Sequence, residues 1–274
     1  MPELPEVETI RQALKRGGRG AAPIVGQEVR ESHLEWERTL AEPSPAQFHE
    51  RITGQEIVDI DRRGKFLLLR LSPDTLIVHL RMSGDLNVVP YSEPVAEHDR
   101  LWLDLDDNRR LAFNDTRKFG RVWLVDDATS VTGHLGPEPL DDDFTPEAFH
   151  ANLHAHRRQL KPLLLDQAFL AGMGNIYTDE ALHLAHLHPL ELSNSLDESQ
   201  SKRLWESIRQ VLQEGIKRQG ASIDWVYKGG DFQNYFRVYQ RTGSPCPECG
   251  NPIQRITVGQ RGTHYCQNCQ PEPS

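Results

Sequence analysis

Apolar residues recur at helical spacing at the start of the chain. Val7, Ile10 and Leu14 fall on one face of residues 7–15, and Glu3, Glu6 and Glu8 lie near the beginning of this segment. Acidic side chains stabilise the positive end of a helix dipole, and an apolar stripe lets a helix pack on a core. We therefore expect an amphipathic helix here.

Short apolar runs separated by turn-forming residues follow over residues 27–125. The runs cover residues 56–60, 66–71, 76–80, 101–105, 111–113 and 122–125. Several strands at this spacing are typical of a β-sandwich or barrel. The pattern therefore predicts a β-rich first half.

The second half of the chain has a helical pattern. Residues 135–143 contain two prolines and four acidic residues, which suits a linker. The helices expected after it cover residues 146–154, 160–167, 176–187 and 197–218. The sequence AGMGN at 171–175 predicts a tight connection, because glycine permits close backbone approach.

Composition places the chain among globular proteins. It has 274 residues, of which 37% are hydrophobic, enough to bury a core. No apolar run approaches the roughly 20 residues that span a bilayer, and no secretory signal pattern follows Met1, so we expect a cytoplasmic protein without a membrane partner.

The charge distribution bears on nucleic-acid binding. A net charge of -9 argues against a nucleic-acid partner, because phosphate binding needs clustered basic side chains. Basic residues do occur in groups, although such groups usually belong to solvated surface. These groups are Arg62, Arg63 and Lys65; Arg109 and Arg110; Arg117 and Lys118; and Arg157, Arg158 and Lys161.

Four cysteines near the C-terminus have the spacing of a metal site. Cys246 and Cys249 are separated by two residues, as are Cys266 and Cys269, with 16 residues between the pairs. This spacing predicts one structural Zn²⁺ with four thiolate ligands, whereas two redox dithiols would need a thioredoxin-like context that is absent. A closed tetrahedral site folds its module and does not catalyse.

A hairpin is expected between the two cysteine pairs. Gly250 and Gly262 are consistent with its turns. Arg255 and Arg261 lie on it, and one of them could reach a phosphate or a base edge.

The start of the chain allows two interpretations. An initiator Met1 is normally removed before a small residue such as Pro2, which would leave a secondary amine as a nucleophile. An α-amino group has a pKa of about 7.7 to 8, so part of it is unprotonated at neutral pH. Alternatively, proline and glutamate simply begin a helix well.

Several blocks of the sequence resemble one enzyme family. PELPEVET at residues 2–9 closely resembles the amino-terminal signature of the formamidopyrimidine-DNA glycosylases. The remaining blocks match that family in order, over nearly the whole chain. They are RRGKFLLL at 62–69, HLRMSG at 79–84, DTRKFG at 115–120, LGPEPL at 135–140, KPLLLDQ at 161–167, GMGNIY at 172–177 and QRGTHYC at 260–266.

The resemblance implies an α+β multidomain fold. An N-terminal catalytic domain, with a helix and a β-sandwich, would span residues 1–134, and residues 135–144 would be a linker. A helix-two-turns-helix DNA-binding domain would span 145–235, and a β-hairpin zinc finger 236–274. DNA would run through a cleft between the domains.

The same resemblance implies a bifunctional base excision repair enzyme. It would remove formamidopyrimidines and 8-oxoguanine from damaged double-stranded DNA and cleave the abasic site by β,δ-elimination. Pro2 would form the Schiff base, Glu3 would protonate the sugar with support from Glu6, and Lys65 would contact phosphate and transfer protons. The resemblance also implies that Arg261 belongs to this catalytic set.

The resemblance also implies a set of DNA contacts. Met82, Arg117 and Phe119 would fill the space left by the extruded base and face the orphaned partner base, although Met82 and Phe119 also suit a core. Asn175 at a helix start would bind phosphate, or serve as an N-cap only. The remaining contacts implied are His79, His98, Lys161 and Tyr177.

Other functions stay open at this stage. The segment at residues 220–233 is shorter than the glycine-rich loop of the family's longer members, which puts the capping of 8-oxoguanine in doubt. An endonuclease VIII type glycosylase for oxidised pyrimidines shares Pro2 and Glu3, and a zinc-finger protein without catalysis is the alternative of another class. We expect a monomer that uses no nucleotide cofactor.

Overall fold

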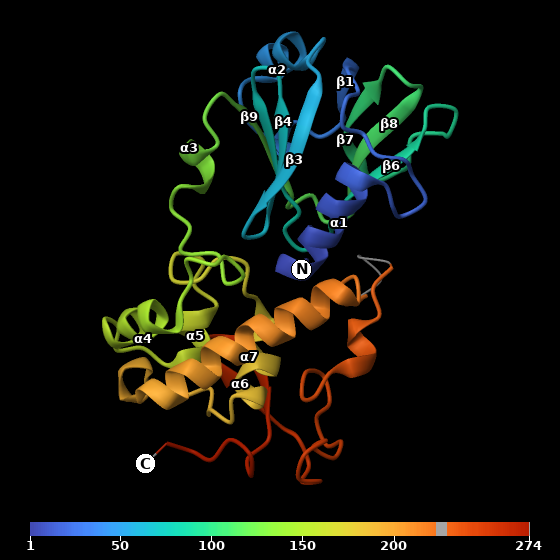
Figure 1. Cartoon of the computed structure of the whole chain (residues 1–274). Coiled ribbons are helices and arrows are strands. Elements are labelled where there is room, and N and C mark those ends of the chain that lie inside the picture. The colour runs from blue at the N-terminus through green and yellow to red at the C-terminus, as the bar shows by residue number, and fades with distance from the viewer. Residues whose placement is uncertain (223–228, 274) are drawn as a thin grey trace. The chain divides into compact units, whose positions relative to one another are not determined.

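The computed structural model describes residues 1–222 and 229–273, which form two compact units (Figure 1). Unit 1 contains Met1–His134 and Gln219–Gly230, and unit 2 contains Leu135–Arg218 and Asp231–Ser274. Within the described part, no helix has the length and apolar character needed to cross a membrane.

Unit 1 begins with helix α1, Leu4–Arg16, which carries the expected buried residues Val7, Ile10 and Leu14. The helix starts three residues earlier than the apolar pattern suggests. Its N-cap, Glu3, forms a capping box with Glu6, which satisfies backbone N–H groups that have no partner inside the helix. The helix start is therefore fixed by acidic side chains.

Unit 1 also contains two sheets, which confirm the predicted sandwich. In the described residues, one sheet has the order β2-β9-β5-β4-β3 and the other β1-β7-β8-β6. Their strands are β1 Val29–Leu34, β2 Leu40–Glu42, β3 Ile57–Arg63, β4 Phe66–Leu71, β5 Thr75–His79, β6 Gly84–Pro90, β7 Asp99–Leu105, β8 Arg109–Asp115 and β9 Arg121–Val125. All six predicted strands are present; β4 has the predicted bounds and the other five have shifted ends.

One apolar core joins the sheets and α1. Leu67 and Val78 of the first sheet, Leu103 and Phe113 of the second, and Ile10 of α1 belong to the same buried cluster. Side chains alternate across each strand, so the inward residues of both sheets meet in this core. The core holds the start of α1 and the strand ends of this unit in fixed positions.

Several elements of unit 1 escaped the sequence analysis. Helix α2, Pro45–Ile52, lies in a region where we expected only strands. Its signal is present in the sequence, because Ser44 and Gln47 form a capping box around Pro45. Strand β1 is mostly polar, and β2 is very short. Neither strand has the apolar run that predicts a strand from sequence. Short turns complete the unit, with η1 at Glu37–Thr39 and α3 at Thr129–Thr132.

Unit 2 contains the expected helices. They are α4 Pro146–His154, α5 Leu160–Leu164, α6 Asn175–Leu184 and α7 Glu198–Lys217, with 3-10 turns η2 Ser193–Ser195 and η3 Phe232–Tyr235. Gly215 of α7 lies against Tyr177 of α6, where an added Cβ would be 2.5 Å from the ring. Glycine therefore allows these two helices to pack closely.

The connection between α5 and α6 differs in detail from our expectation. Helix α5 ends at Leu164, three residues early, and the side chain of Gln167 accepts from Gly172 N–H and donates to the carbonyl of Met173. Gly174 is the N-cap of α6, and Asn175 is its first helical residue. The interpretation of Asn175 as an N-cap is therefore wrong.

The zinc module contains the expected hairpin, formed by β10 Gln254–Val258 and β11 Arg261–Tyr265. The turn is Gly259–Gln260, both with positive φ, which matches the twist of a two-residue hairpin. Gly262 lies in β11, so its predicted place in a turn is wrong. Gly250, with φ 78, does occupy a turn after Cys249.

Candidate active site

The first residues of the chain form a buried acidic site in unit 1. Pro2, Glu3 and Glu6 are all buried. The Glu3 N–H donates to Glu6 Oε2 at 2.8 Å, and the Ala221 N–H donates to Glu6 Oε1 at 2.7 Å. Glu6 therefore bridges the helix start and the segment after α7, and it fixes the backbone next to Pro2.

Gly220 makes this bridge possible. Its φ is 81, and an added Cβ would lie 2.7 Å from Glu6 Oε1. A larger residue would displace the Glu6 carboxylate from Ala221. This contact was missed by the sequence analysis, which assigned residues 220–233 only a possible role in capping the base. The prediction about capping of the base falls partly on residues 223–228, which lie outside the described residues.

Lys65 is held in the turn between β3 and β4. The turn residues are Gly64, with φ 55, and Lys65, whose side chain is buried. Arg62 donates to the Gly64 carbonyl at 3.1 Å and to Glu8 of α1 at 3.2 Å. One helix therefore positions both Pro2, at its start, and the Lys65 turn, through Glu8.

His79 lies at the end of β5 as a neutral imidazole. Burial, followed by the charges of Arg81 and Lys65, lowers the pKa of His79 to about 3. The Arg81 N–H donates to His79 Nδ1 at 3.0 Å, so the single ring proton is on Nε2. His79 therefore offers an N–H donor rather than a positive charge.

Met82, Arg117 and Phe119 lie on two loops of unit 1 and are exposed. Met82 is 41% exposed and Phe119 is 52% exposed, so the alternative that they belong to the core is wrong. The Arg117 guanidinium lies over the Phe119 ring at 5.1 Å. Exposed apolar side chains beside a guanidinium form a surface suited to contact with bases.

One buried carboxylate joins these two loops. Asp115 is fully buried and accepts hydrogen bonds from Ser83 Oγ, from Arg117 N–H at 3.2 Å and from Gly120 N–H at 2.7 Å. Ser83 follows Met82, so Asp115 connects the Met82 loop to the Arg117 loop. Asp115 begins the DTRKFG motif, but its sequence context indicated no role for it.

His98 belongs to the same part of unit 1. Its carbonyl accepts from Asp115 N–H at 2.8 Å, and its Nδ1 lies 3.2 Å from a guanidinium nitrogen of Arg100. Arginine can only donate, so His98 Nδ1 is the acceptor and Nε2 carries the proton. His98 is therefore held as an N–H donor beside the loop of Arg117.

Lys161 and Tyr177 of unit 2, predicted as DNA contacts, are both buried. Lys161 is fully buried and forms an ion pair with Asp179. The Tyr177 ring is fully buried and stacks on Phe232 with centroids 5.2 Å apart. Each side chain is enclosed by its packing partners, and a DNA contact by either residue stays a prediction.

Asn175 and Arg261 lie near one another in the fold of unit 2. Asn175 Nδ2 donates to the carbonyl of Gly262 at 3.0 Å, and Arg261 is the exposed residue before it. The N-terminus of α6 carries a positive partial charge that favours anions. These two residues present an N–H group and a guanidinium on adjoining elements.

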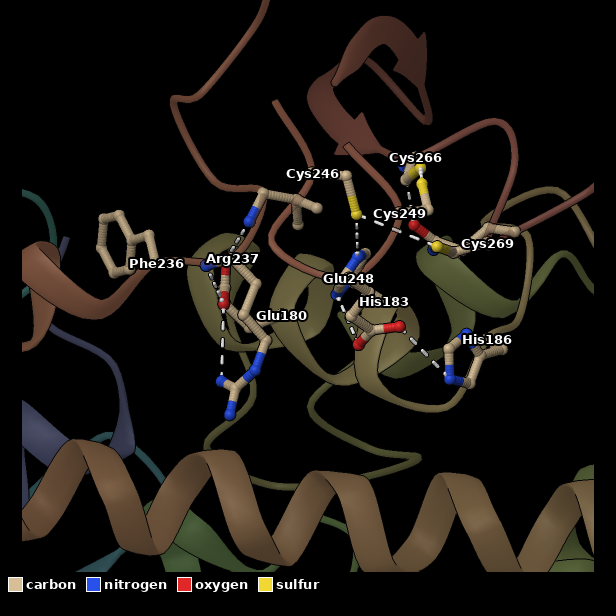
Figure 2. Close-up of polar contacts among 12 residues, drawn as sticks. Glu180, His183, His186, Phe236, Arg237, Cys246, Glu248, Cys249, Cys266 and Cys269 are labelled. Carbon is tan, nitrogen blue, oxygen red and sulfur yellow. Dashed lines mark hydrogen bonds and ion pairs between the residues drawn. The ribbon is translucent and has the colours of Figure 1, made fainter. Parts of the chain in front are cut away.

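The four cysteines converge in unit 2 (Figure 2). Their sulfurs lie within 4.8 Å of one another, with 3.8 Å between Cys246 and Cys269 and 3.4 Å between Cys249 and Cys266. Tetrahedral zinc with bonds of about 2.3 Å places its sulfurs about 3.8 Å apart. The cluster therefore suits one structural zinc ion, as the spacing predicts.

Buried polar residues of α6 were also missed. Asp179 accepts from His264 N–H at 2.9 Å, and Glu180 accepts from the N–H groups of Arg237, Val238 and Tyr239 at 2.8 to 2.9 Å. Burial raises the pKa of Glu180, and these backbone bonds oppose that rise. In a sequence, acidic residues within a helical segment are typical of a solvent-exposed face. These buried contacts are therefore evident only from the fold.

Comparisons with known proteins agree with this geometry. Three family models match in order: the formamidopyrimidine-DNA glycosylase N-terminal domain over residues 1–122, its H2TH domain over 135–226, and a zinc finger found in FPG and IleRS over 243–271. Similar curated proteins are the formamidopyrimidine-DNA glycosylases of Protochlamydia amoebophila and Chloroflexus aurantiacus. The first is 42% identical over 98% of this chain and 99% of its own length, and the second is 46% identical over 98% of each.

Solved structures give the same result. A complex of Lactococcus lactis FPG with Fapy-dG-containing DNA has a TM-score of 0.90 and 38% identity, covering 98% of this chain and 100% of the other. A complex of MutM with DNA containing carbocyclic 8-oxo-G has a TM-score of 0.91 and 38% identity, covering 99% and 100%. The chain belongs to the formamidopyrimidine-DNA glycosylase family.

Proposed function

We propose that this chain removes oxidised purines from double-stranded DNA and cleaves the resulting abasic site, with the amine of Pro2 as nucleophile. The observation that carries this assignment is the buried start of α1, where Pro2 directly precedes Glu3 and the Glu6 carboxylate accepts from the Glu3 N–H. The named activity of the family, formamidopyrimidine-DNA glycosylase, supports the substrate class.

The first chemical step follows from this arrangement. After Met1 is removed, the unprotonated Pro2 nitrogen attacks C1′ of the damaged nucleotide, and the C1′–N bond breaks as the base takes up a proton. Glu3 protonates the ring oxygen O4′, which opens the sugar and leaves a positively charged imine on Pro2. Glu6 holds the Glu3 backbone in place through its hydrogen bond.

Strand cleavage uses the imine as an electron sink. Loss of a C2′ proton expels the 3′ phosphate, and a second elimination expels the 5′ phosphate. Water then releases the sugar fragment and regenerates the amine. Lys65, buried in the turn tied to α1, is the group we assign to phosphate contact and proton transfer. No nucleotide cofactor enters these steps.

The remaining matched residues are assigned to DNA. Extrusion of the damaged base from the stack costs a few kcal/mol. Met82 and Phe119 would occupy the space that the base leaves, and Arg117 would hydrogen-bond the orphaned base. His79, His98, Asn175 and Arg261 would grip phosphates as N–H donors. We place the protein in the cytoplasm, where the bacterial chromosome lies, and propose that it acts as a monomer.

A lesion panel tests this function. Duplexes carrying 8-oxoguanine, a formamidopyrimidine or thymine glycol are incubated with the mature protein, and both base release and strand breaks are measured. We expect the two purine lesions to be released at least tenfold faster than thymine glycol, with strand breaks at the same sites. Preferred release of thymine glycol would instead support the oxidised-pyrimidine branch, and binding without release would support a non-catalytic protein.

A further inference from the structure

Helix α6 presents a stripe of three polar residues to the zinc module. Asn175, Asp179 and His183 are spaced four residues apart, so they lie along one face of the helix. Asn175 contacts Gly262, Asp179 contacts His264, and His183 contacts Cys246. One helix face therefore reaches from the hairpin to a cysteine of the metal cluster.

The middle of this stripe is firmly held. Asp179 is buried and pairs with Lys161 on one oxygen. Its other oxygen accepts from the backbone N–H of His264 at 2.9 Å and faces the His264 ring at 3.1 Å. Such a satisfied buried carboxylate fixes the helix against β11.

The contact at the metal end is an N–H to sulfur hydrogen bond. His183 is fully buried, and its Nε2 lies 3.3 Å from Cys246 Sγ (Figure 2). Its Nδ1 has no hydrogen-bond partner among the described residues, and Glu248 Oε1 lies 3.9 Å away from it. A zinc-bound thiolate can only accept a hydrogen bond, so Nε2 must carry the proton when zinc is bound.

We propose that His183 is a positioning residue that stabilises the zinc-bound thiolate of Cys246 and connects the metal to α6. The donated hydrogen bond withdraws negative charge from the sulfur, which lowers its reactivity toward electrophiles and toward protons. Outer hydrogen bonds of this kind contribute about 10- to 100-fold to metal affinity. Loss of zinc would release the His183 end of the stripe, whose other end is Asn175 at the start of α6.

Matched variants separate hydrogen bonding from packing. His183→Phe keeps a ring of similar size without a donor, and His183→Gln places an amide N–H near the position of Nε2. We expect His183→Phe to lose zinc to a chelator at least tenfold faster than the original chain, and His183→Gln to restore most of the difference. Modification of Cys246 by a thiol alkylating agent, mapped by mass spectrometry, should increase in parallel in His183→Phe.

The control is His186→Phe, because His186 is half exposed and contacts Glu248 at 3.5 Å rather than a thiolate. It should release zinc at the original rate. Equal release rates for folded His183→Phe and the original chain would overturn the proposal. So would equal acceleration in His183→Phe and His183→Gln, since that would show that the ring packs without donating.

A measurement on the unsubstituted chain applies even if His183→Phe does not fold. The zinc is replaced by ¹¹³Cd, and scalar coupling between the metal and the His183 Nε2 proton is sought by NMR. A coupling shows that the hydrogen bond reaches the metal-bound sulfur. A resolved Nε2 proton without coupling, or a proton on Nδ1, would refute the inferred role of His183.

Discussion

His79 and Lys65 are two buried nitrogen groups with different charges. Lys65 is 5% exposed and His79 is 7% exposed, and the Lys65 charge contributes to the low pKa of His79. A second cation in the same surroundings would be repelled and would lose its hydration. The imidazole therefore remains neutral beside the lysine, and the proposed phosphate grip combines one charge with one neutral donor.

This arrangement predicts a dependence of stability on pH. The pKa of His79 is about 3 in the folded chain, against 6.5 for an unperturbed histidine, so the unfolded chain binds the proton first as pH falls. The contribution of neutral His79 is fully present above pH 6.5 and is lost as pH falls toward 3. The loss is at most about 1.4 kcal/mol per pH unit.

His79→Asn provides the comparison, because its side-chain oxygen can still accept from Arg81 N–H while the titrating group is removed. Urea unfolding is measured at several pH values between 6.5 and 4. The free energy of unfolding should fall more steeply for the original chain than for His79→Asn. Parallel curves for the two proteins would show that His79 does not titrate as described.

The loops of unit 1 illustrate how an element is positioned from a distance. Arg117 and Phe119 are exposed, yet their loop is held by Asp115, which is fully buried. Gly120 is required at the end of this loop, because an added Cβ would lie 2.3 Å from Phe113. The exposed side chains are thus presented by a rigid support, as contact with an orphaned base requires.

Replacement of Asp115 tests whether this support matters. Asp115→Asn replaces one accepting oxygen with an NH₂ group, so the side chain can no longer accept from both Ser83 and Gly120. Loss of such a buried hydrogen bond costs about 1 to 3 kcal/mol. We expect excision of 8-oxoguanine to slow by about tenfold, and the dependence of the rate on the opposite base to decrease, in single-turnover assays.

The control is Asp61→Asn, since Asp61 pairs with Arg70 on the surface. It should change neither rate nor preference. An Asp115→Asn protein that melts at a lower temperature but keeps the original rate and preference would show that Asp115 contributes to stability alone.

Over the whole chain, the sequence predicted most of the fold and the metal site. Apolar spacing was sufficient for α1, α4, α7 and six strands, and cysteine spacing was sufficient for the zinc cluster, because each of these signals is local. The burial of Lys161 and Tyr177 was not evident from the sequence, since it depends on Asp179 and Phe232, which are distant in sequence. The roles of Asp115, Glu180 and His183 likewise depend on partners that only folding brings near.

The proposed reaction requires the Pro2 nitrogen to become bonded to the sugar. The mature protein is mixed with a duplex containing an abasic site, the complex is reduced with borohydride, and the adduct is digested and mapped by mass spectrometry. We expect a reduced sugar on an N-terminal peptide that begins with Pro2, and no adduct when an N-terminal tag blocks the amine. An adduct that persists with the tag, or that maps to an internal lysine such as Lys65, would contradict it.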